Sequence, residues 1–292
     1  MRITTCQAPN SDHIVLGLHE YLKDQLGKPL ELVIDMPWQD RAKMLYDGEI
    51  DIAWICGLPY TRHTDAGTAA YELLATPARN AKRYLNRPVF FSDLVIRADS
   101  DAQVLTDLRG ATVAYNEPES FSGYTALRAH IASIDEHELF DKIYEAGSHE
   151  EALELIKTSV VDVAAIDSTV LEMQEAINPS SVRGLKVLRS LGPYPGPPLV
   201  ISKRLPKSIR ETIRTAVLNM HNNSLGRQLL EQGMLSRFME VNDNDYDIIR
   251  NLDQVSRQVT DWSHRTHMNN LPSLNELRGQ EEIISSELLL SR

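Results

Sequence analysis

The residues best suited to chemistry gather around a Ser-Phe-Ser-Gly turn at positions 120–123. The turn follows a strand-like run over 111–115 and precedes a helical pattern that starts at Tyr124. Hydroxyl side chains and free backbone N–H groups then meet at a helix start, where the helix dipole adds partial positive charge. Such a turn can bind a phosphate-like anion without a lysine. The alternative is that Ser120 or Ser122 only caps its own helix, a common use of serine.

Two more polar residues follow at strand and helix ends. His149 begins a helical pattern over 149–157, where a neutral imidazole could donate to a ligand oxygen. Asp167 ends an apolar strand-like run, where a carboxylate is unfavourable unless it is paired or solvated in a cleft. The alternatives are a surface position for His149 and a cap of the helix over 168–176 for Asp167.

Tyr60 follows a Gly-Leu-Pro turn at the end of another strand-like run, and its phenol could face a cleft. The alternative is an aromatic ring packed under a loop. Ser120, His149 and Asp167 include the residue types of a hydrolytic triad, but nothing marks either serine of the turn as an activated nucleophile. The sequence also lacks the Gly-x-Ser-x-Gly, P-loop and His-Glu-x-x-His motifs. We therefore favour binding over catalysis.

The composition argues against several classes of partner. The chain has 292 residues, a formal net charge of −11 at pH 7, 42% hydrophobic and 24% charged residues. Because duplex binding usually shows a clustered basic face, we expect no nucleic-acid partner. Cys6 and Cys56 lie in strand-like runs and predict buried free thiols, and we expect neither a metal site nor a cofactor. No run approaches the roughly 18 apolar residues of a membrane span.

The expected elements that position these residues indicate an α/β fold with mainly parallel strands, because strand-like and helix-like segments alternate. The stretch over 48–55 is similar in sequence to the stretch over 159–166. In both, a helix precedes an acidic residue and a small apolar strand. Similar units in two halves suggest two lobes, with a cleft at the carboxyl ends of their strands between Tyr60 and Asp167. We predict lobe one over 1–90, lobe two over 91–190, a return to lobe one over 191–250, and a C-terminal helical extension over 251–292, with an apolar run at 283–290.

The motifs, taken in order, resemble the phosphonate, phosphite and phosphate branch of periplasmic substrate-binding proteins that feed ABC transporters. The segments that carry the resemblance are 48–55, 57–60, 91–96, 108–110, 114–123, 147–152 and 161–167. The resemblance implies a type 2 periplasmic-binding-protein fold. Its two lobes would close on a small phosphorus oxyanion without reacting with it.

The same resemblance implies a set of ligand-binding residues: Tyr60, Ser120, Phe121, Ser122, Gly123, His149 and Asp167. The turn would hold the oxyanion through its hydroxyls and backbone, Tyr60 and His149 would add donors, and Asp167 would face a substituent or a protonated ligand oxygen. A carboxylate beside an anion selects against full deprotonation of the ligand.

The resemblance also implies an ABC permease as partner, a monomer, and a periplasmic location. The sequence opens on a strand-like run without the charged and apolar regions of an export leader, so a cytoplasmic location stays open. The alternative functions are a cytoplasmic enzyme or a ligand sensor on the same fold. The sensor would contact its partner through the residues beyond 260.

Overall fold

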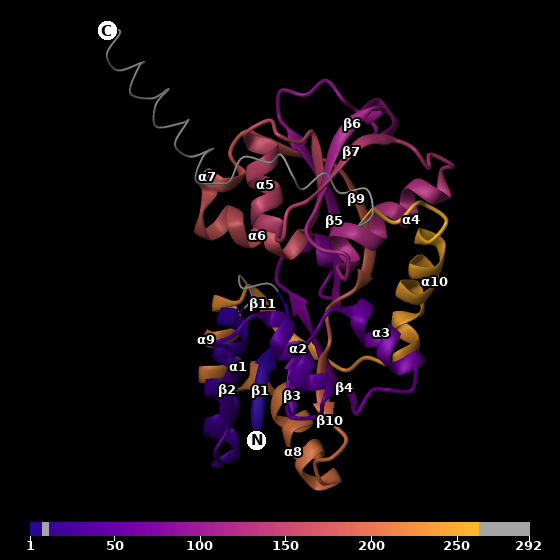
Figure 1. Cartoon of the computed structure of the whole chain (residues 1–292). Helices are drawn as coiled ribbons and strands as arrows, with labels where there is room; N and C mark the ends of the chain where they lie inside the picture. Colours follow the sequence, from indigo (N-terminus) through magenta and orange to yellow (C-terminus); the bar gives the residue numbers. More distant parts are fainter. Residues whose placement is uncertain (8–11, 263–292) are drawn as a thin grey trace, which may run out of the picture.

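The computed structural model describes residues 1–7 and 12–262 as two sheet-bearing lobes, one above the other in Figure 1. Lobe one, below, holds a six-stranded sheet of order β11-β4-β10-β3-β1-β2, and lobe two holds a five-stranded sheet of order β7-β6-β8-β5-β9. The strands are β1 (Arg2–Thr5), β2 (Glu31–Val33), β3 (Ile52–Trp54), β4 (Tyr71–Arg79), β5 (Val89–Arg97), β6 (Ala111–Tyr115), β7 (Phe140–Glu145), β8 (Val163–Asp167), β9 (Leu185–Pro195), β10 (Leu199–Ser202) and β11 (Leu235–Met239).

Helices cover the faces of both sheets, and their bounds follow the apolar spacing of the sequence. In α1, Val15, Leu18 and Leu22 recur at helical spacing and are buried in the core of lobe one. The α-helices are α1 (Asp12–Leu26), α2 (Trp38–Tyr46), α3 (Gly57–Asp65), α4 (Ala126–Ser133), α5 (His149–Lys157), α6 (Ser168–Ile177), α7 (Pro179–Val182), α8 (Lys207–Leu218), α9 (Ser224–Gln232) and α10 (Asp247–Ser256).

The expectation of mainly parallel strands is wrong. Of the pairings between described strands, four are parallel and five are antiparallel. The reason lies in the crossings between the lobes. Strands β5 and β10 each enter a sheet from the cleft, so they run against β8 and β3, whose carboxyl ends face the cleft.

The crossings lie between β4 and β5 and between β9 and β10. The predicted lobe boundaries at 90 and 190 therefore fall inside β5 and β9, which belong entirely to the sheet of lobe two. Residues on both sides of each predicted boundary pair within this sheet.

The C-terminal part of the described chain contacts both lobes. Helix α10 begins at Asp247, four residues before the predicted extension, and packs against α3 of lobe one and α4 of lobe two (Figure 1). Arg62 of α3 pairs with Asp253 of α10 at 2.8 Å, while the Trp262 ring packs on Tyr124 in lobe two. The rest of the predicted extension, with its apolar run at 283–290, lies outside the described residues.

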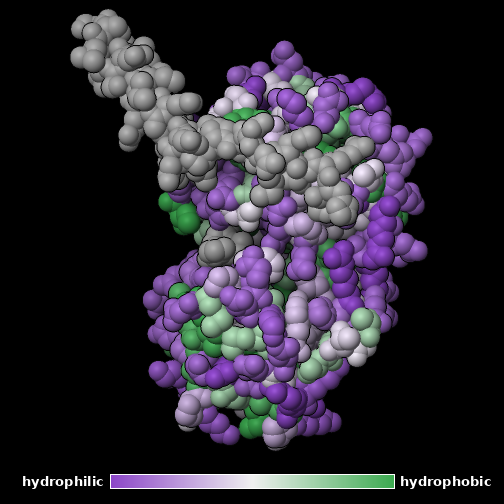
Figure 2. Space-filling model, viewed as in Figure 1, coloured by the Kyte–Doolittle hydropathy of each residue, from purple (hydrophilic) through white to green (hydrophobic). Residues whose placement is uncertain are grey.

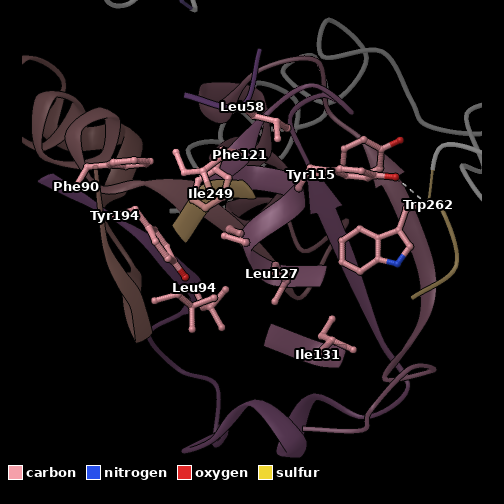
Figure 3. Packing of buried hydrophobic residues seen from close by; sticks show 14 of the residues in the cluster. Leu58, Phe90, Leu94, Tyr115, Phe121, Leu127, Ile131, Tyr194, Ile249 and Trp262 are labelled. Carbon is pink, nitrogen blue, oxygen red and sulfur yellow. Dashed lines mark hydrogen bonds between the residues drawn. The ribbon is translucent and has the colours of Figure 1, made fainter. Parts of the chain in front are cut away.

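One apolar core joins the lobes. Phe90, Phe121 and Tyr194 form an aromatic group in it, and Leu58 and Ile249 belong to the same cluster (Figure 3). Hydrophilic residues cover most of the face in Figure 2, and hydrophobic residues appear there in small separate patches. Within the described residues, no helix is long and apolar enough to cross a membrane.

Candidate ligand site

A cavity of about 70 Å³ lies between the lobes at the carboxyl ends of their strands. Its lining from lobe one includes Cys6, Trp54 and Arg79, and its lining from lobe two includes Ser120, His149 and Asp167. A single water needs roughly 10–15 Å³, so the cavity exceeds one water and suits only a small molecule. The lining is divided between polar and apolar groups.

The Ser-Phe-Ser-Gly turn forms a π-helical turn, Phe121–Thr125, that leads into α4. Such turns are rare and frequently lie at functional sites. The Ser120 hydroxyl accepts the Gly123 N–H at 3.1 Å, so the capping alternative holds for this serine, which also lines the cavity. At Gly123 a Cβ would lie 1.9 Å from Asn116 Oδ1, so no other residue fits without displacing its neighbours.

Ser122 and His149 meet in the cavity. Ser122 Oγ lies 3.3 Å from His149 Nε2, and the Ser122 carbonyl accepts the Ser92 hydroxyl at 2.7 Å. His149 is buried at the start of α5, so the surface alternative for it is wrong. Burial lowers the pKa of His149 to about 4, against the opposing effect of the Ala165 carbonyl. The imidazole is therefore neutral at pH 7, and one of its ring nitrogens can donate.

Asp167 both caps a helix and lines the cavity. Its Oδ1 accepts the Thr169 N–H at 2.7 Å at the start of α6. Burial raises the pKa of Asp167 to about 6, although Thr169 and Arg79 act in the opposite direction. Glu117, also in the lining, has a pKa raised to about 7 by burial and by the nearby charges of other glutamates. Both carboxyl groups can thus take up a proton close to neutral pH.

Tyr60 does not line the cavity. The Gly-Leu-Pro stretch, which the sequence analysis predicts as a turn, forms the first residues of α3. Proline is tolerated in the first turn of a helix. The Tyr60 phenol donates to Asp243 Oδ1 at 2.6 Å, and its ring packs against Tyr246. The phenol is therefore committed to the fold.

Phe121 also turns its side chain away from the cavity. The ring is fully buried in the core between Phe90 and Tyr194 (Figure 3). Only the backbone of Phe121 belongs to the turn. The prediction for this residue concerned that backbone, and it stays a prediction.

Sequence reasoning did not single out Arg79, Asn116 or Glu117, which all line the cavity. Each stands at or just after the end of a strand, and a polar residue in that place is a usable signal. Cys6 and Cys56 are free thiols that also line the cavity, and burial raises their pKa values to about 12 and about 11. Across residues 1–7 and 12–262, no group of three or more His, Cys, Asp or Glu could hold a metal ion.

Two lobes joined by two crossing segments, with a partly polar cavity where the strands of both lobes end, define the type 2 periplasmic-binding-protein fold. This confirms the predicted fold class. The chain belongs to the family described as "ABC transporter, phosphonate, periplasmic substrate-binding protein", which matches residues 5–246. The resemblance seen in the sequence is thereby confirmed.

Individual relatives agree with this assignment. The phosphonates-binding periplasmic protein of Escherichia coli K12 is 24% identical over 194 residues, which cover 63% of this chain and 54% of that protein. The match thus spans about half the length of this relative.

Two solved structures show the same fold. A binding protein component of an ABC phosphonate transporter from Pseudomonas aeruginosa has a TM-score of 0.76 and 21% identity, covering 99% of this chain and 95% of that one. PhnD1 from Prochlorococcus marinus, in complex with methylphosphonate, has a TM-score of 0.75 and 17% identity, covering 89% of this chain and 98% of that one.

Proposed function

We propose that the protein binds a small phosphorus oxyanion (a phosphonate, phosphite or phosphate) in the cavity, as the substrate-binding component of an ABC transporter. The observation that carries the proposal is the meeting of Ser122 Oγ and the neutral His149 Nε2, 3.3 Å apart, in a small cavity at the start of a helix. Both groups can donate hydrogen bonds to an anion, and the backbone N–H groups at a helix N-terminus favour an anion there.

Four of the predicted site residues line the cavity, namely Ser120, Ser122, His149 and Asp167, and Gly123 lies beside them in the turn. The hydroxyls of Ser120 and Ser122 and the backbone of the turn hold the oxyanion, and His149 adds a donor. Gly123 lets the backbone approach closely, since a side chain there would strike Asn116. Asp167 faces a substituent or a protonated ligand oxygen.

We further propose that the protein does not transform its ligand. A serine triad needs an acid that orients the histidine. Within the described part of the chain, Asp167 is hydrogen-bonded to Thr169 and no hydrogen bond joins it to His149. This arrangement favours binding over the enzyme alternative.

Family membership supports the remaining proposals, which are an ABC permease as partner, a periplasmic location and a monomeric state. Closure of the lobes on the ligand would then signal occupancy to the permease.

A thermal-shift screen tests the ligand class. The compounds are phosphate, phosphite, methylphosphonate, 2-aminoethylphosphonate and sulfate. A ligand at 100 times its Kd stabilises the folded state by about 2.7 kcal/mol, which is easily detected. A selective shift with a phosphorus oxyanion supports the proposal. Stabilisation by none of the phosphorus compounds contradicts it and favours the sensor or enzyme alternative.

A further inference from the structure

Arg79 holds a guanidinium group in the cavity with unused hydrogen-bond donors. The residue ends β4 in lobe one, lines the cavity, and is only 5% exposed. Its Nε and Nη2 atoms have no hydrogen-bond partner among the described residues. Buried polar groups nearly always have such partners, so two unpartnered donor nitrogens on a buried cation need an explanation.

A carboxylate stands near Arg79 without using these donors. Glu172 of α6 places Oε2 3.8 Å from Arg79 Nε, which is close enough for an ion pair and too far for a hydrogen bond. Its other oxygen, Oε1, accepts the Tyr84 hydroxyl at 2.8 Å. Glu172 therefore balances the charge of Arg79 and leaves its N–H groups available.

Arg83, four residues further along, shows the contrasting arrangement. Its guanidinium forks onto Asp93 with distances of 2.9 and 2.8 Å, and it is absent from the cavity lining. A guanidinium fork matches two oxygens of a carboxylate or phosphate group. In Arg83 that fork is filled by the protein, whereas in Arg79, which lines the cavity, the Nε and Nη2 groups have no hydrogen-bond partner among the described residues.

We propose that Arg79 binds the anionic oxygens of the ligand from lobe one, opposite the hydroxyl turn of lobe two. This inference rests on the proposed function and narrows its ligand class. The ligand carries at least two anionic or acceptor oxygens for the fork besides those held by the turn. A tetrahedral oxyanion meets this requirement. It would link the lobes, because Arg79 comes from lobe one and the hydroxyl turn comes from lobe two.

The test measures the Kd of methylphosphonate, inorganic phosphate and phosphite by isothermal titration at pH 7.5 for the full chain and its variants. Arg79→Gln should weaken binding on the order of 10- to 100-fold, as expected for loss of hydrogen bonds to a charged group. Arg237→Gln is the matched control. It removes the same charge from β11, where Arg237 is exposed and pairs with Ala78, beside Arg79.

Glu172→Gln separates a ligand role from a structural one. Glutamine keeps an acceptor for Tyr84 and removes the charge that competes for Arg79. The proposal expects binding to tighten several-fold, whereas a purely structural Arg79–Glu172 pair predicts unchanged or weaker binding. This variant decides the question if Arg79→Gln fails to fold.

The outcomes are distinct. Weak binding by Arg79→Gln, with Arg237→Gln like the original protein, supports the assignment. Binding by Arg79→Gln within about threefold of the original overturns the role of Arg79 and leaves the proposed function standing. Failure of the unaltered protein to bind any of the three probes overturns the proposed function, and the role of Arg79 with it.

Discussion

Replacement of Ser122 by alanine tests the anion site most directly. The change removes one hydroxyl from the cavity and leaves the backbone of the turn, including the Ser122 carbonyl that accepts from Ser92. Among the described residues, the hydroxyl makes one hydrogen bond, to His149 Nε2 at 3.3 Å, which is long. The folded state should therefore lose little stability, about 0.5 kcal/mol or less.

Ligand affinity should fall much more than stability. A hydrogen bond to a charged group contributes about 1.5–3 kcal/mol, so the Kd should rise on the order of 10- to 100-fold. The assay is isothermal titration with whichever phosphorus oxyanion stabilises the unaltered protein, together with urea unfolding without ligand. Because Ser120 Oγ also accepts from Gly123, Ser120→Ala should lose stability as well, by about 1 kcal/mol.

Ser133→Ala provides the control, since this exposed serine ends α4, into which the turn leads, and its hydroxyl donates to the His130 carbonyl. Its affinity should equal that of the original protein. An unchanged Kd for Ser122→Ala would refute the reasoning, because it would show that this hydroxyl makes no hydrogen bond to the ligand. A loss of stability as large as the loss of affinity would show a structural role instead.

Three further changes test neighbouring parts of the argument. Gly123→Ala drives a Cβ into Asn116 and should cost about 1–3 kcal/mol in urea unfolding, with part of the loss recovered when Asn116 is also changed to alanine. Asp167→Asn keeps a helix cap and removes a carboxyl whose pKa is raised to about 6 in the folded state. Since a raised pKa means that the folded state holds the proton more tightly, the original protein should lose stability relative to this variant as the pH rises from about 4 to 6, and equal pH profiles would contradict the assignment. Tyr60→Phe should cost about 1 kcal/mol through its lost bond to Asp243 and leave ligand affinity unchanged; a weaker Kd would restore Tyr60 to the site.

Local sequence signals predicted many of the elements correctly. The expected strand over 111–115 and the expected helix over 149–157 coincide with β6 and α5, because the spacing of apolar residues and the capping residues act within one element. The position of Ser120 and Ser122 at a strand-to-helix turn was likewise visible in the sequence. The ligand-binding role of these serines stays a prediction.

Positions that depend on distant partners could not be predicted in this way. The Gly-Leu-Pro stretch could open a loop or a helix, and the partner of Tyr60 is Asp243, which lies 183 residues away in the sequence. The antiparallel entry of β5 and β10 depends on where the chain passes between the lobes, which no local pattern encodes.

The sequence by itself determined the two-lobed class, the family and the position of the Ser-Phe-Ser-Gly turn between a strand and a helix, since ordered motifs and local periodicity carry that information. Only the tertiary structure decided that the Tyr60 phenol bonds to Asp243, and that Arg79 lines the cavity with buried N–H donors that have no partner among the described residues. The physical reason is that the role of a polar side chain depends on its hydrogen-bond and ion-pair partners. For Tyr60 the partner is Asp243, in the turn just before α10, and for Arg79 the nearby carboxylate is Glu172 of lobe two. Burial sets the pKa values of His149 and Asp167.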